Sequence, residues 1–355
     1  MKGFVIERNI KLNELPGTLT TRASEPKPQG AEVLVDVQAL QGLYQHKPAF
    51  PFVAGCEFSG TISPDSPLPK GCPYKHGQKV FGAGQGAYAE RIKVDWKSLV
   101  PVPENVTMEQ AAGLYITYPT SYAALVYRAE IKKGEYLLIH AAAGGVGMAA
   151  LQIGKALGAK VIALCSTQDK LDVCTRAGAD FAINYADEKA QNGGWQKQVM
   201  AVTKGHGADV IYDPVGLLIP SLKCIAWNGR ALVVGFAAGT IEKAGLTSAG
   251  VALNPRLILS PMLCRRQVPA NLILLKNIAI SGVHWGAYQK NQPEMVPATW
   301  EALLKLFNSG TLKAVVFDRI FEGLESVPEA LDELLARRTW GKAVVRVKTD
   351  KTAKL

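Results

Sequence analysis

The chain has 355 residues and a formal net charge of +10 at pH 7, with 48% hydrophobic and 20% charged residues. This length and apolar content predict about two folded domains and argue against intrinsic disorder. The lysines and arginines are dispersed, without a basic helix or an aromatic-rich basic run, so dedicated nucleic-acid binding is not expected. The charge is compatible with an anionic cofactor, an acidic thioester substrate or simply a solvated surface.

The cysteine pattern bears on metals and on the cellular compartment. No Cys-x-x-Cys pair or metal-ligand spacing occurs, so structural zinc is not expected. The first residues look like a strand and not like a secretory leader, which indicates a reducing compartment and free thiols. The longest apolar stretch is broken by a histidine and by glycines, so we expect a soluble protein without a membrane span. The cysteines are Cys56, Cys72, Cys165, Cys174, Cys224 and Cys264.

The first part of the chain, up to about Gly113, is predicted to form a strand-rich domain, because short β-like runs alternate with proline, glycine and charged residues. The runs are Gly3–Glu7, Glu32–Val37, Gly60–Ile62, Gln78–Phe81 and Ala87–Val94. After Val106 the pattern changes, and helices are expected at Met108–Leu114 and Tyr122–Ala129.

The middle of the chain alternates between strands and helix-compatible segments such as Asp169–Ala177, which is the rhythm of a doubly wound parallel sheet. A final helix at Pro297–Asn308 and strands near Ala314–Phe317 and Ala343–Val347 suggest that the tail returns to the first domain. A cleft is then expected between the two domains. The strands of the predicted parallel sheet are Val161–Leu164, Phe181–Asn184, Val210–Asp213, Ala231–Val234 and Ile278–Val283.

The strongest motif lies at Tyr136–Gly158, where an apolar run meets small residues, a glycine cluster and a helix-like pattern. It is predicted to form a buried strand, a phosphate-binding turn and a helix. Ala142, Gly144 and Gly147 occupy the three glycine places of the dinucleotide fingerprint, with alanine at the first. Small residues let the backbone approach a pyrophosphate, which the free amides of the helix then face. A tight turn without a ligand is the alternative.

The end of the next strand bears on the choice between NAD and NADP. An NAD-binding chain is expected to carry an acidic residue about 20 positions beyond the fingerprint. This chain has Cys165, Ser166 and Thr167 there, with Lys170 one turn later, whereas Asp169 is more consistent with the first turn of a helix. A hydroxyl and an ammonium suit a ribose phosphate, and a carboxylate would repel it. We therefore predict NADPH as the cofactor.

Six segments are informative in combination: PFVAGCEFSG at Pro51–Gly60, GAYAE at Gly86–Glu90, AAGLYITYPTSYAAL at Ala111–Leu125, HAAAGGVG at His140–Gly147, GADFAINY at Gly178–Tyr185 and LLKNIAISGVHWGAY at Leu274–Tyr288. Together they resemble the zinc-free quinone oxidoreductase (zeta-crystallin-like) branch of the medium-chain dehydrogenase/reductase superfamily. The resemblance implies an α/β fold with a GroES-like catalytic domain at residues 1–113, completed by 305–355, and a Rossmann domain at 114–304. It further implies that NADPH passes a hydride to a quinone or an α,β-unsaturated carbonyl.

The resemblance also assigns residues to the cofactor, although each could instead belong to the surface or the core. Arg338 could take the place of Arg337 if the register slips by one residue. The assigned residues are Thr120 at the nicotinamide end, Gly144, Gly145, Val146 and Gly147 along the pyrophosphate, Ser166, Lys170, Tyr185 and Arg337 around the 2′-phosphate, and Phe236. Relatives often form homodimers through their Rossmann sheets, for which an edge strand at Ile278–Val283 could serve.

Zinc and acid–base chemistry depend on two further positions. Zinc-dependent relatives carry a histidine directly before a glutamate, but this chain has Cys56 before Glu57, so no metal site is expected and Cys56 is predicted to be a buried small residue. Tyr44 matches the tyrosine that enoyl-thioester reductases of the superfamily use near the substrate. It is therefore a candidate proton donor after hydride addition, although a role as a cleft-wall aromatic is equally consistent.

Two segments depart from the family pattern. Residues 38–42 replace a longer segment that carries an asparagine and an aspartate bordering the nicotinamide, and about ten residues are missing by comparison with that pattern. Residues 244–268 look like an insertion, for which a lid, a dimer element, a disordered excursion and an incorrectly predicted exon boundary stay open. The shortened segment raises the possibility of impaired catalysis.

Three functional hypotheses follow. The first is an NADPH-dependent reductase of quinones or conjugated carbonyls. The second is an enoyl-CoA reductase, suggested by Tyr44 and by the terminal Ala353-Lys354-Leu355, which resembles a relaxed peroxisomal signal. The third is a cofactor-binding protein with impaired catalysis, suggested by the shortened segment. Cytoplasmic and peroxisomal locations stay open.

Overall fold

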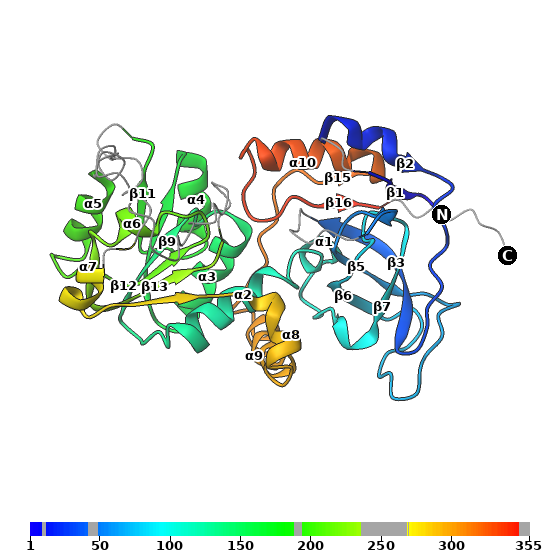
Figure 1. The fold of residues 1–355 in the computed structure, drawn as a ribbon, viewed down its shortest axis with the longest axis horizontal. Coiled ribbons are helices and arrows are strands. Elements are labelled where there is room, and N and C mark those ends of the chain that lie inside the picture. Colours follow the sequence, from blue (N-terminus) through cyan, green and yellow to red (C-terminus); the bar gives the residue numbers. More distant parts are fainter. Residues whose placement is uncertain (9–11, 42–48, 188–193, 236–267, 269, 348–355) are drawn as a thin grey trace, which may run out of the picture. The chain divides into compact units, whose positions relative to one another are not determined.

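The computed structural model describes all residues except 9–11, 42–48, 188–193, 236–267, 269 and 348–355 (Figure 1). The chain divides into two compact units. Unit 1 comprises Met1–Tyr122, Gly144–Gln152 and Trp285–Leu355, and unit 2 comprises Ala123–Ala143 and Ile153–His284. The domain boundaries inferred from the sequence, near residues 113 and 304, stay a prediction.

Unit 1 is the strand-rich unit. Its larger sheet has the strand order β15-β16-β3-β5-β6-β8, with β7 paired to β3, and a smaller sheet has the order β2-β1-β4. All five strands predicted before Gly113 are present with shifted ends. The strands of this unit are β1 Gly3–Ile6, β2 Leu19–Thr20, β3 Glu32–Gln41, β4 Phe52–Val53, β5 Glu57–Ile62, β6 Lys79–Ala83, β7 Arg91–Asp95, β8 Leu99–Pro101, β15 Phe321–Glu322 and β16 Val345–Arg346.

The core of unit 1 follows from the two-residue repeat of its strands. Val33, Val35 and Val37 lie on one face of β3 and are fully buried. Helix α10, Val327–Leu335, packs into the same apolar cluster through residues spaced three and four apart. The other helices of the unit are α1 Met108–Ala111, α2 Thr117–Tyr122, α8 Tyr288–Asn291 and α9 Met295–Asn308.

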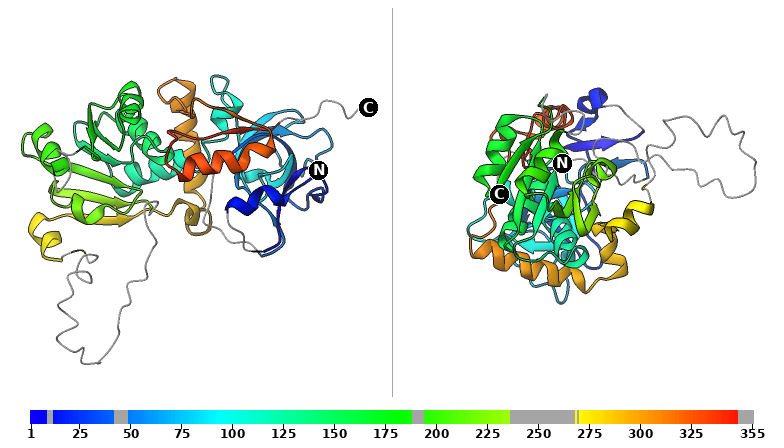
Figure 2. Two further views of the ribbon diagram at one scale, coloured as in Figure 1. Left: turned by 90° about the horizontal axis from the view of Figure 1, so that it is seen from above. Right: turned by 90° about the vertical axis from the view of Figure 1, so that its left-hand side faces the viewer.

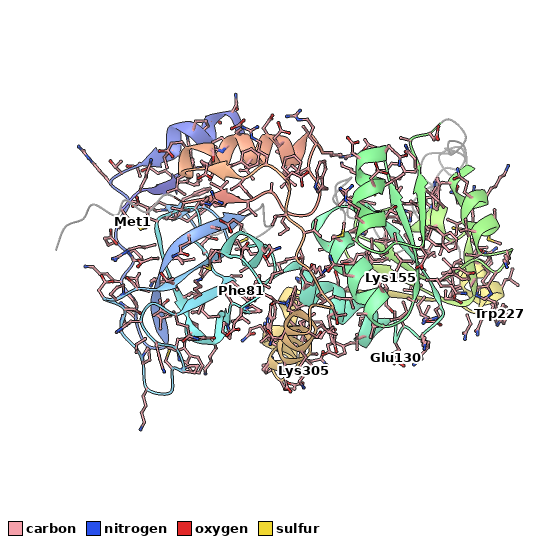
Figure 3. All side chains as sticks on the ribbon, turned by 180° about the vertical axis from the view of Figure 1, so that it is seen from behind. Met1, Phe81, Glu130, Lys155, Trp227 and Lys305 are labelled. Carbon is pink, nitrogen blue, oxygen red and sulfur yellow. The ribbon has the colours of Figure 1, made fainter. Side chains whose placement is uncertain are left out.

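An aromatic cluster connects α9 to the larger sheet of unit 1. The ring of Trp300 on α9 meets the edge of Phe81 on β6, with centroids 5.2 Å apart, and lies 5.3 Å from the ring of Tyr115. Phe81 is fully buried and is labelled in Figure 3. Because such pairs add about 1 kcal/mol each beyond their buried area, the cluster holds α9 against β6.

Unit 2 contains the predicted doubly wound sheet. All its strand pairs are parallel, in the order β11-β10-β9-β12-β13-β14 (Figure 1). Leu137, Leu138 and Ile139 of β9 are fully buried, as expected for a central strand covered on both faces. All strands predicted for this sheet are present. They are β9 Tyr136–His140, β10 Lys160–Cys165, β11 Phe181–Asn184, β12 Ala208–Asp213, β13 Ile225–Val233 and β14 Ala279–Gly282.

Helices cover both faces of this sheet (Figure 2). One face shares an apolar cluster with residues of α5, α6 and α7, and Leu138 belongs to that cluster. The adjacent Leu137 points to the other face, where a Cβ on Gly154 of α3 would lie only 2.5 Å from its Cδ2. The helices are α3 Gly145–Ala156, which continues from unit 1 into unit 2, α4 Gln168–Arg176, α5 Gly194–Val202, α6 Leu218–Ser221 and α7 Ala270–Lys276.

Two elements differ from the sequence prediction. No strand forms at Ala314–Phe317, where the pairing is limited to an isolated bridge between Val316 and Lys342. Side chains bind the backbone at the start of this segment: Gln110 donates to the carbonyl of Ala314, and Gln152 bonds both the amide and the carbonyl of the preceding Lys313. The helix predicted at Tyr122–Ala129 is a π-helix, Ala123–Arg128, that continues α2.

Among the described residues, no helix has both the length and the apolar character that crossing a membrane would require. The insertion near residues 244–268 and the terminal Ala353-Lys354-Leu355 fall outside the described residues, apart from Val268. The cellular location therefore stays a prediction.

Candidate cofactor site

The predicted phosphate turn joins β9 to α3 at the point where the strand order of the unit 2 sheet reverses. From β9 the chain runs outward to β10 and β11, and then returns to β12 on the other side of β9. Ligands of open α/β sheets bind at such a switch point, outside the carboxyl ends of the strands. The turn begins with Ala141 in the left-handed region, at φ 46°. The motif prediction is confirmed as strand, turn and helix.

The first turn of α3 supplies backbone amides. The amide of Met148 donates to the carbonyl of Gly144 over 2.8 Å, closing the first turn. The amides of Gly145, Val146 and Gly147 lie too early in the helix to have a carbonyl acceptor within it. They are therefore the groups that a phosphate would engage. The sequence assigns these three residues to the pyrophosphate, and that role stays a prediction.

The side chain of Lys342 lies so close to residue 145 that only glycine fits there without a shift. A Cβ on Gly145 would lie 2.8 Å from Cδ of Lys342 and 3.2 Å from Cγ2 of Thr117. A Cβ on Gly113 would similarly lie 2.8 Å from Cγ of Lys342. Gly144 also forms a parallel bridge with Gly341. The aliphatic stem of Lys342 thus passes between two glycines and packs against the start of α3.

A buried ion pair fixes the end of that lysine. Nζ of Lys342 lies 2.9 Å from Oε2 of Glu57, whose exposed fraction is 2%. Oε1 of Glu57 accepts a hydrogen bond from the amide of Ile116 at 3.0 Å. The sequence analysis did not identify this pair, because its partners are 285 positions apart. The one signal was the Cys56-Glu57 step, which the sequence analysis relates to zinc.

Three residues assigned to the 2′-phosphate surround the carboxyl ends of β10 and β11. The amide of Tyr185 donates to the carbonyl of Cys165 at 3.0 Å, which places the two strand ends side by side. Ser166 follows directly, and Lys170 lies in the first turn of α4. Asp169 is an exposed first-turn residue of the same helix, as the sequence predicted. The structure therefore brings Ser166, Lys170 and Tyr185 together in unit 2.

Two further predicted residues lie in unit 1. Arg337 is exposed and follows α10 at φ 57°. The guanidinium of the adjacent Arg338 is bound by Glu333 at 2.8 Å and by Asp332 at 3.0 Å. Thr120 of α2 is 8% exposed, and its hydroxyl donates to the carbonyl of Ile116 at 2.6 Å. Tyr44 and Phe236 fall outside the described residues.

Two buried polar groups stand at the switch point and were not predicted. His140 ends β9, and Asp213 ends the neighbouring β12, one position beyond the registered pair Ile139 and Tyr212. Nδ1 of His140 and Oδ2 of Asp213 are buried without a hydrogen-bond partner. Burial lowers the pKa of His140 to about 4, and it raises the pKa of Asp213 despite amide hydrogen bonds to that carboxylate. The sequence contains no pattern that would predict that His140 and Asp213 are buried on neighbouring strands.

The tautomer of His140 follows from its partner. The hydroxyl of Ser221 donates to the carbonyl of Leu217 at 2.6 Å, so its oxygen must accept the proton of His140 Nε2, 2.7 Å away. Nδ1 is then a bare acceptor. Oδ2 of an ionised Asp213 is an acceptor as well, so both unpaired atoms are acceptors.

The described residues include no group of three or more histidine, cysteine, aspartate or glutamate side chains placed to hold a metal ion. Cys56 is half-buried and not fully buried as predicted. Burial and, to a lesser degree, the charge of Glu57 raise the pKa of the Cys56 thiol to about 12. Because a metal-ligating cysteine must be a thiolate, this position is a poor metal ligand.

Comparisons with known proteins agree with the geometry. A family model described as zinc-binding dehydrogenase matches residues 145–309. A quinone oxidoreductase-like protein 2 homologue of Nematostella vectensis is 34% identical over 318 residues, which cover 88% of this chain and 78% of the relative. The mouse quinone oxidoreductase-like protein 2 is 32% identical over 353 residues, covering 94% and 91%.

A solved structure extends the likeness to three dimensions. The quinone oxidoreductase of Thermus thermophilus, determined also in complex with NADPH, is 26% identical and superposes with a TM-score of 0.76. The likeness covers 98% of this chain and 100% of that one. The GroES-like and Rossmann fold class predicted from the sequence is thereby confirmed.

Proposed function

We propose that this chain, which belongs to the quinone oxidoreductase branch of the medium-chain dehydrogenase/reductase superfamily, is an NADPH-dependent reductase of quinones or α,β-unsaturated carbonyls that works without zinc. When bound, the nicotinamide would supply the hydride. The residues of this chain would bind the dinucleotide and orient it. The related quinone oxidoreductase determined with NADPH supports this choice of cofactor.

One observation carries the cofactor proposal. The carboxyl end of β10 presents Ser166 and Lys170, with Tyr185 beside them, in the place where an NAD-binding chain carries a carboxylate. An ammonium and a hydroxyl provide charge-assisted hydrogen bonds to a phosphate. The residues present therefore fit a dinucleotide that bears a 2′-phosphate.

The residues at the zinc position favour a reaction without metal. Both carboxylate oxygens of Glu57 are engaged, one by Lys342 and the other by the amide of Ile116. The adjacent Cys56 has a raised pKa and would be a neutral thiol at pH 7. This donor set does not suit zinc, which prefers thiolates, imidazoles and free carboxylates.

The β3 strand favours one competing function, a cofactor-binding protein with impaired turnover. β3 continues to Gln41, where it still pairs with Glu57 of β5. The shortened segment at residues 38–41 is thus part of a strand, and it carries no asparagine or aspartate. Tyr44, which suggests the enoyl-CoA reductase alternative, falls outside the described residues.

The test begins with fluorescence titrations of the full chain with NADPH and NADH, followed by addition of 9,10-phenanthrenequinone. We expect tighter binding of NADPH and oxidation that depends on the quinone. In Lys170→Glu, the dissociation constant for NADPH should rise about 10- to 100-fold, because a charged hydrogen bond contributes about 1.5–3 kcal/mol. Binding of NADH should change little in this variant.

The matched control is Lys223→Glu, which makes the same charge change at an exposed residue between α6 and β13. It should keep the NADPH affinity of the unmodified chain. Tight NADPH binding without oxidation by quinones, enones or an enoyl-CoA would replace the proposal by the impaired-turnover function. A strong preference for the thioester would indicate an enoyl-CoA reductase. Equal losses in the two variants would remove Lys170 from the phosphate site.

We further propose that the chain forms a homodimer through β14. Among the described residues this strand pairs with β13 alone, and it stands last in the sheet order of unit 2. Leu274 and Leu275 of α7, which leads into β14, are 78% and 67% exposed, and Trp227 is 67% exposed (Figure 3). A second copy would pair the open edge and cover these side chains.

Sedimentation velocity at micromolar concentration tests the dimer. The unmodified chain should sediment as a dimer, whereas Leu274→Lys combined with Leu275→Lys should sediment as a monomer, because two charges would have to be buried in the interface. Leu335→Lys is the control, since Leu335 is a comparably exposed leucine of unit 1. A monomeric unmodified chain would contradict the proposal.

A further inference from the structure

Two cysteine thiols are in contact beside the proposed 2′-phosphate site. Cys165 is the last residue of β10, and Cys174 lies on α4. Their sulfur atoms are 3.7 Å apart, and their exposed fractions are 2% and 0%. A disulfide needs a sulfur–sulfur distance of about 2.05 Å. Because the atoms already touch, a small local movement of β10 and α4 would bring them to this distance.

The surroundings make the two thiols unequal. The contact with the Cys174 sulfur lowers the pKa of Cys165, and the amides of Ala143 and Ala142 and the charge of Lys170 act in the same direction. The contact with the Cys165 sulfur and burial raise the pKa of Cys174. Cys165 is therefore the nucleophile of the pair, with Cys174 as its neighbouring protonated thiol.

Two other cysteines in the described part of the chain, Cys224 and Cys56, differ from this pair. Burial raises the pKa of Cys224 to about 12, and the Cys56 thiol is raised to about the same value. The amides that act on Cys165 belong to the turn that begins at Ala141. A thiolate at Cys165 would thus occupy the edge of an anion-binding turn, next to a lysine.

We propose that Cys165 and Cys174 are a redox modification site that closes to a reversible disulfide when a hydroperoxide oxidises Cys165. The thiolate of Cys165 attacks the peroxide oxygen, which forms a sulfenic acid and releases hydroxide or alkoxide. The sulfur of Cys174 then attacks the sulfenic sulfur, and hydroxide leaves with the Cys174 proton as water. In sum, two thiols and one hydroperoxide give a disulfide, one water and one further water or alcohol. A dithiol reverses the step.

The disulfide would act on cofactor binding, an effect that rests on the proposed function. The ring it closes contains Ser166 and Lys170, the two residues proposed to hold the 2′-phosphate. Pulling the sulfur atoms together must shift the end of β10 relative to α4. We expect the NADPH dissociation constant of the oxidised chain to rise at least fivefold and to return after treatment with dithiothreitol.

Mass spectrometry tests the modification independently of any cofactor. The full-length chain is treated with hydrogen peroxide, the remaining thiols are alkylated, and the protein is digested with trypsin. Trypsin cleaves after Lys160, Lys170 and Arg176, so the disulfide links two separate peptides, Val161–Lys170 and Leu171–Arg176. We expect this linked pair in the unmodified chain and in Cys224→Ser, which removes another buried cysteine of the same unit.

Two variants identify the roles of the thiols. Cys174→Ser should instead accumulate a sulfenic acid at Cys165 that dimedone traps, and its NADPH affinity should not respond to peroxide. Cys165→Ser should give neither product. Complete alkylation of both cysteines after peroxide treatment of the unmodified chain would overturn the proposal, whether or not the chain binds NADPH. A disulfide that leaves NADPH affinity unchanged would overturn only the effect on cofactor binding.

Discussion

Lys342→Met is expected to lower the free energy of unfolding by about 3–5 kcal/mol, which is the cost of breaking a buried ion pair from one side. The methionine keeps an apolar stem to pack between Gly113 and Gly145 but removes the ammonium. The carboxylate of Glu57, only 2% exposed, then keeps a single hydrogen bond, from the amide of Ile116. Equilibrium unfolding in urea at pH 7, followed by tryptophan fluorescence, measures the change.

Glu57→Gln is the matched variant, and it should cost less. The side chain of Lys342 is 18% exposed, so its ammonium can turn toward water when the carboxylate is gone. The double variant Glu57→Gln, Lys342→Met should be more stable than Lys342→Met alone, because no uncompensated buried charge remains. A Lys342→Met chain within about 0.5 kcal/mol of the unmodified one would show that the pair does not stabilise the unit.

The same variants separate stability from cofactor binding. Lys342 packs on the first residue of α3, whose first-turn amides are the proposed pyrophosphate ligands. If the pair only stabilises the unit, the folded Lys342→Met chain should bind NADPH as the unmodified chain does. A weaker affinity in the folded variant would show that the ion pair also positions the turn.

The sequence predicts local features of this fold well. Tyr136–Gly158 forms the expected strand, turn and helix, and β11 has the predicted bounds Phe181–Asn184. Both follow from patterns of neighbouring residues. At the expected strand Ala314–Phe317, the side chain of Gln110, far away in sequence, instead binds the carbonyl of Ala314. Propensity cannot anticipate such a competitor.

In the candidate site too, the sequence predicts residues that follow local patterns but not contacts that depend on three-dimensional packing. Ser166 and Lys170 could be located because they follow a strand at a fixed distance from the glycine motif. The pairing of Glu57 with Lys342 could not be predicted, because it depends on how β5 packs against the segment at Gly341 in three dimensions. The contact of Cys165 with Cys174 spans only nine positions, but it requires the register of β10 against α4, which the sequence leaves open. Burial of His140 likewise depends on neighbouring strands and helices.

Because the imidazole of His140 is buried, unit 2 is expected to lose stability in acid. The folded chain holds the imidazole neutral, because burial lowers its pKa to about 4 from the ordinary value of 6.5. The unfolded chain takes up a proton below pH 6.5, so protonation favours unfolding. The contribution of His140 is complete above pH 6.5, decreases as the pH falls toward 4 and is lost below that value. The separation of the two pKa values corresponds to about 3 kcal/mol.

His140→Gln should remove this pH dependence, because glutamine can donate to the hydroxyl of Ser221 without titrating. The carboxyl of Asp213, which ends the neighbouring strand, has a raised pKa, so its own contribution has the opposite sign: it is present at low pH and lost as the pH rises. The difference between the unmodified chain and His140→Gln, measured by urea unfolding from pH 4 to pH 7.5, isolates the histidine. His206→Gln, at an exposed histidine of the same unit, is the control and should retain the slope. Parallel pH profiles for the unmodified chain and His140→Gln would mean that the folded imidazole takes up its proton at Nδ1 and donates it to an acceptor, so that its pKa is not lowered.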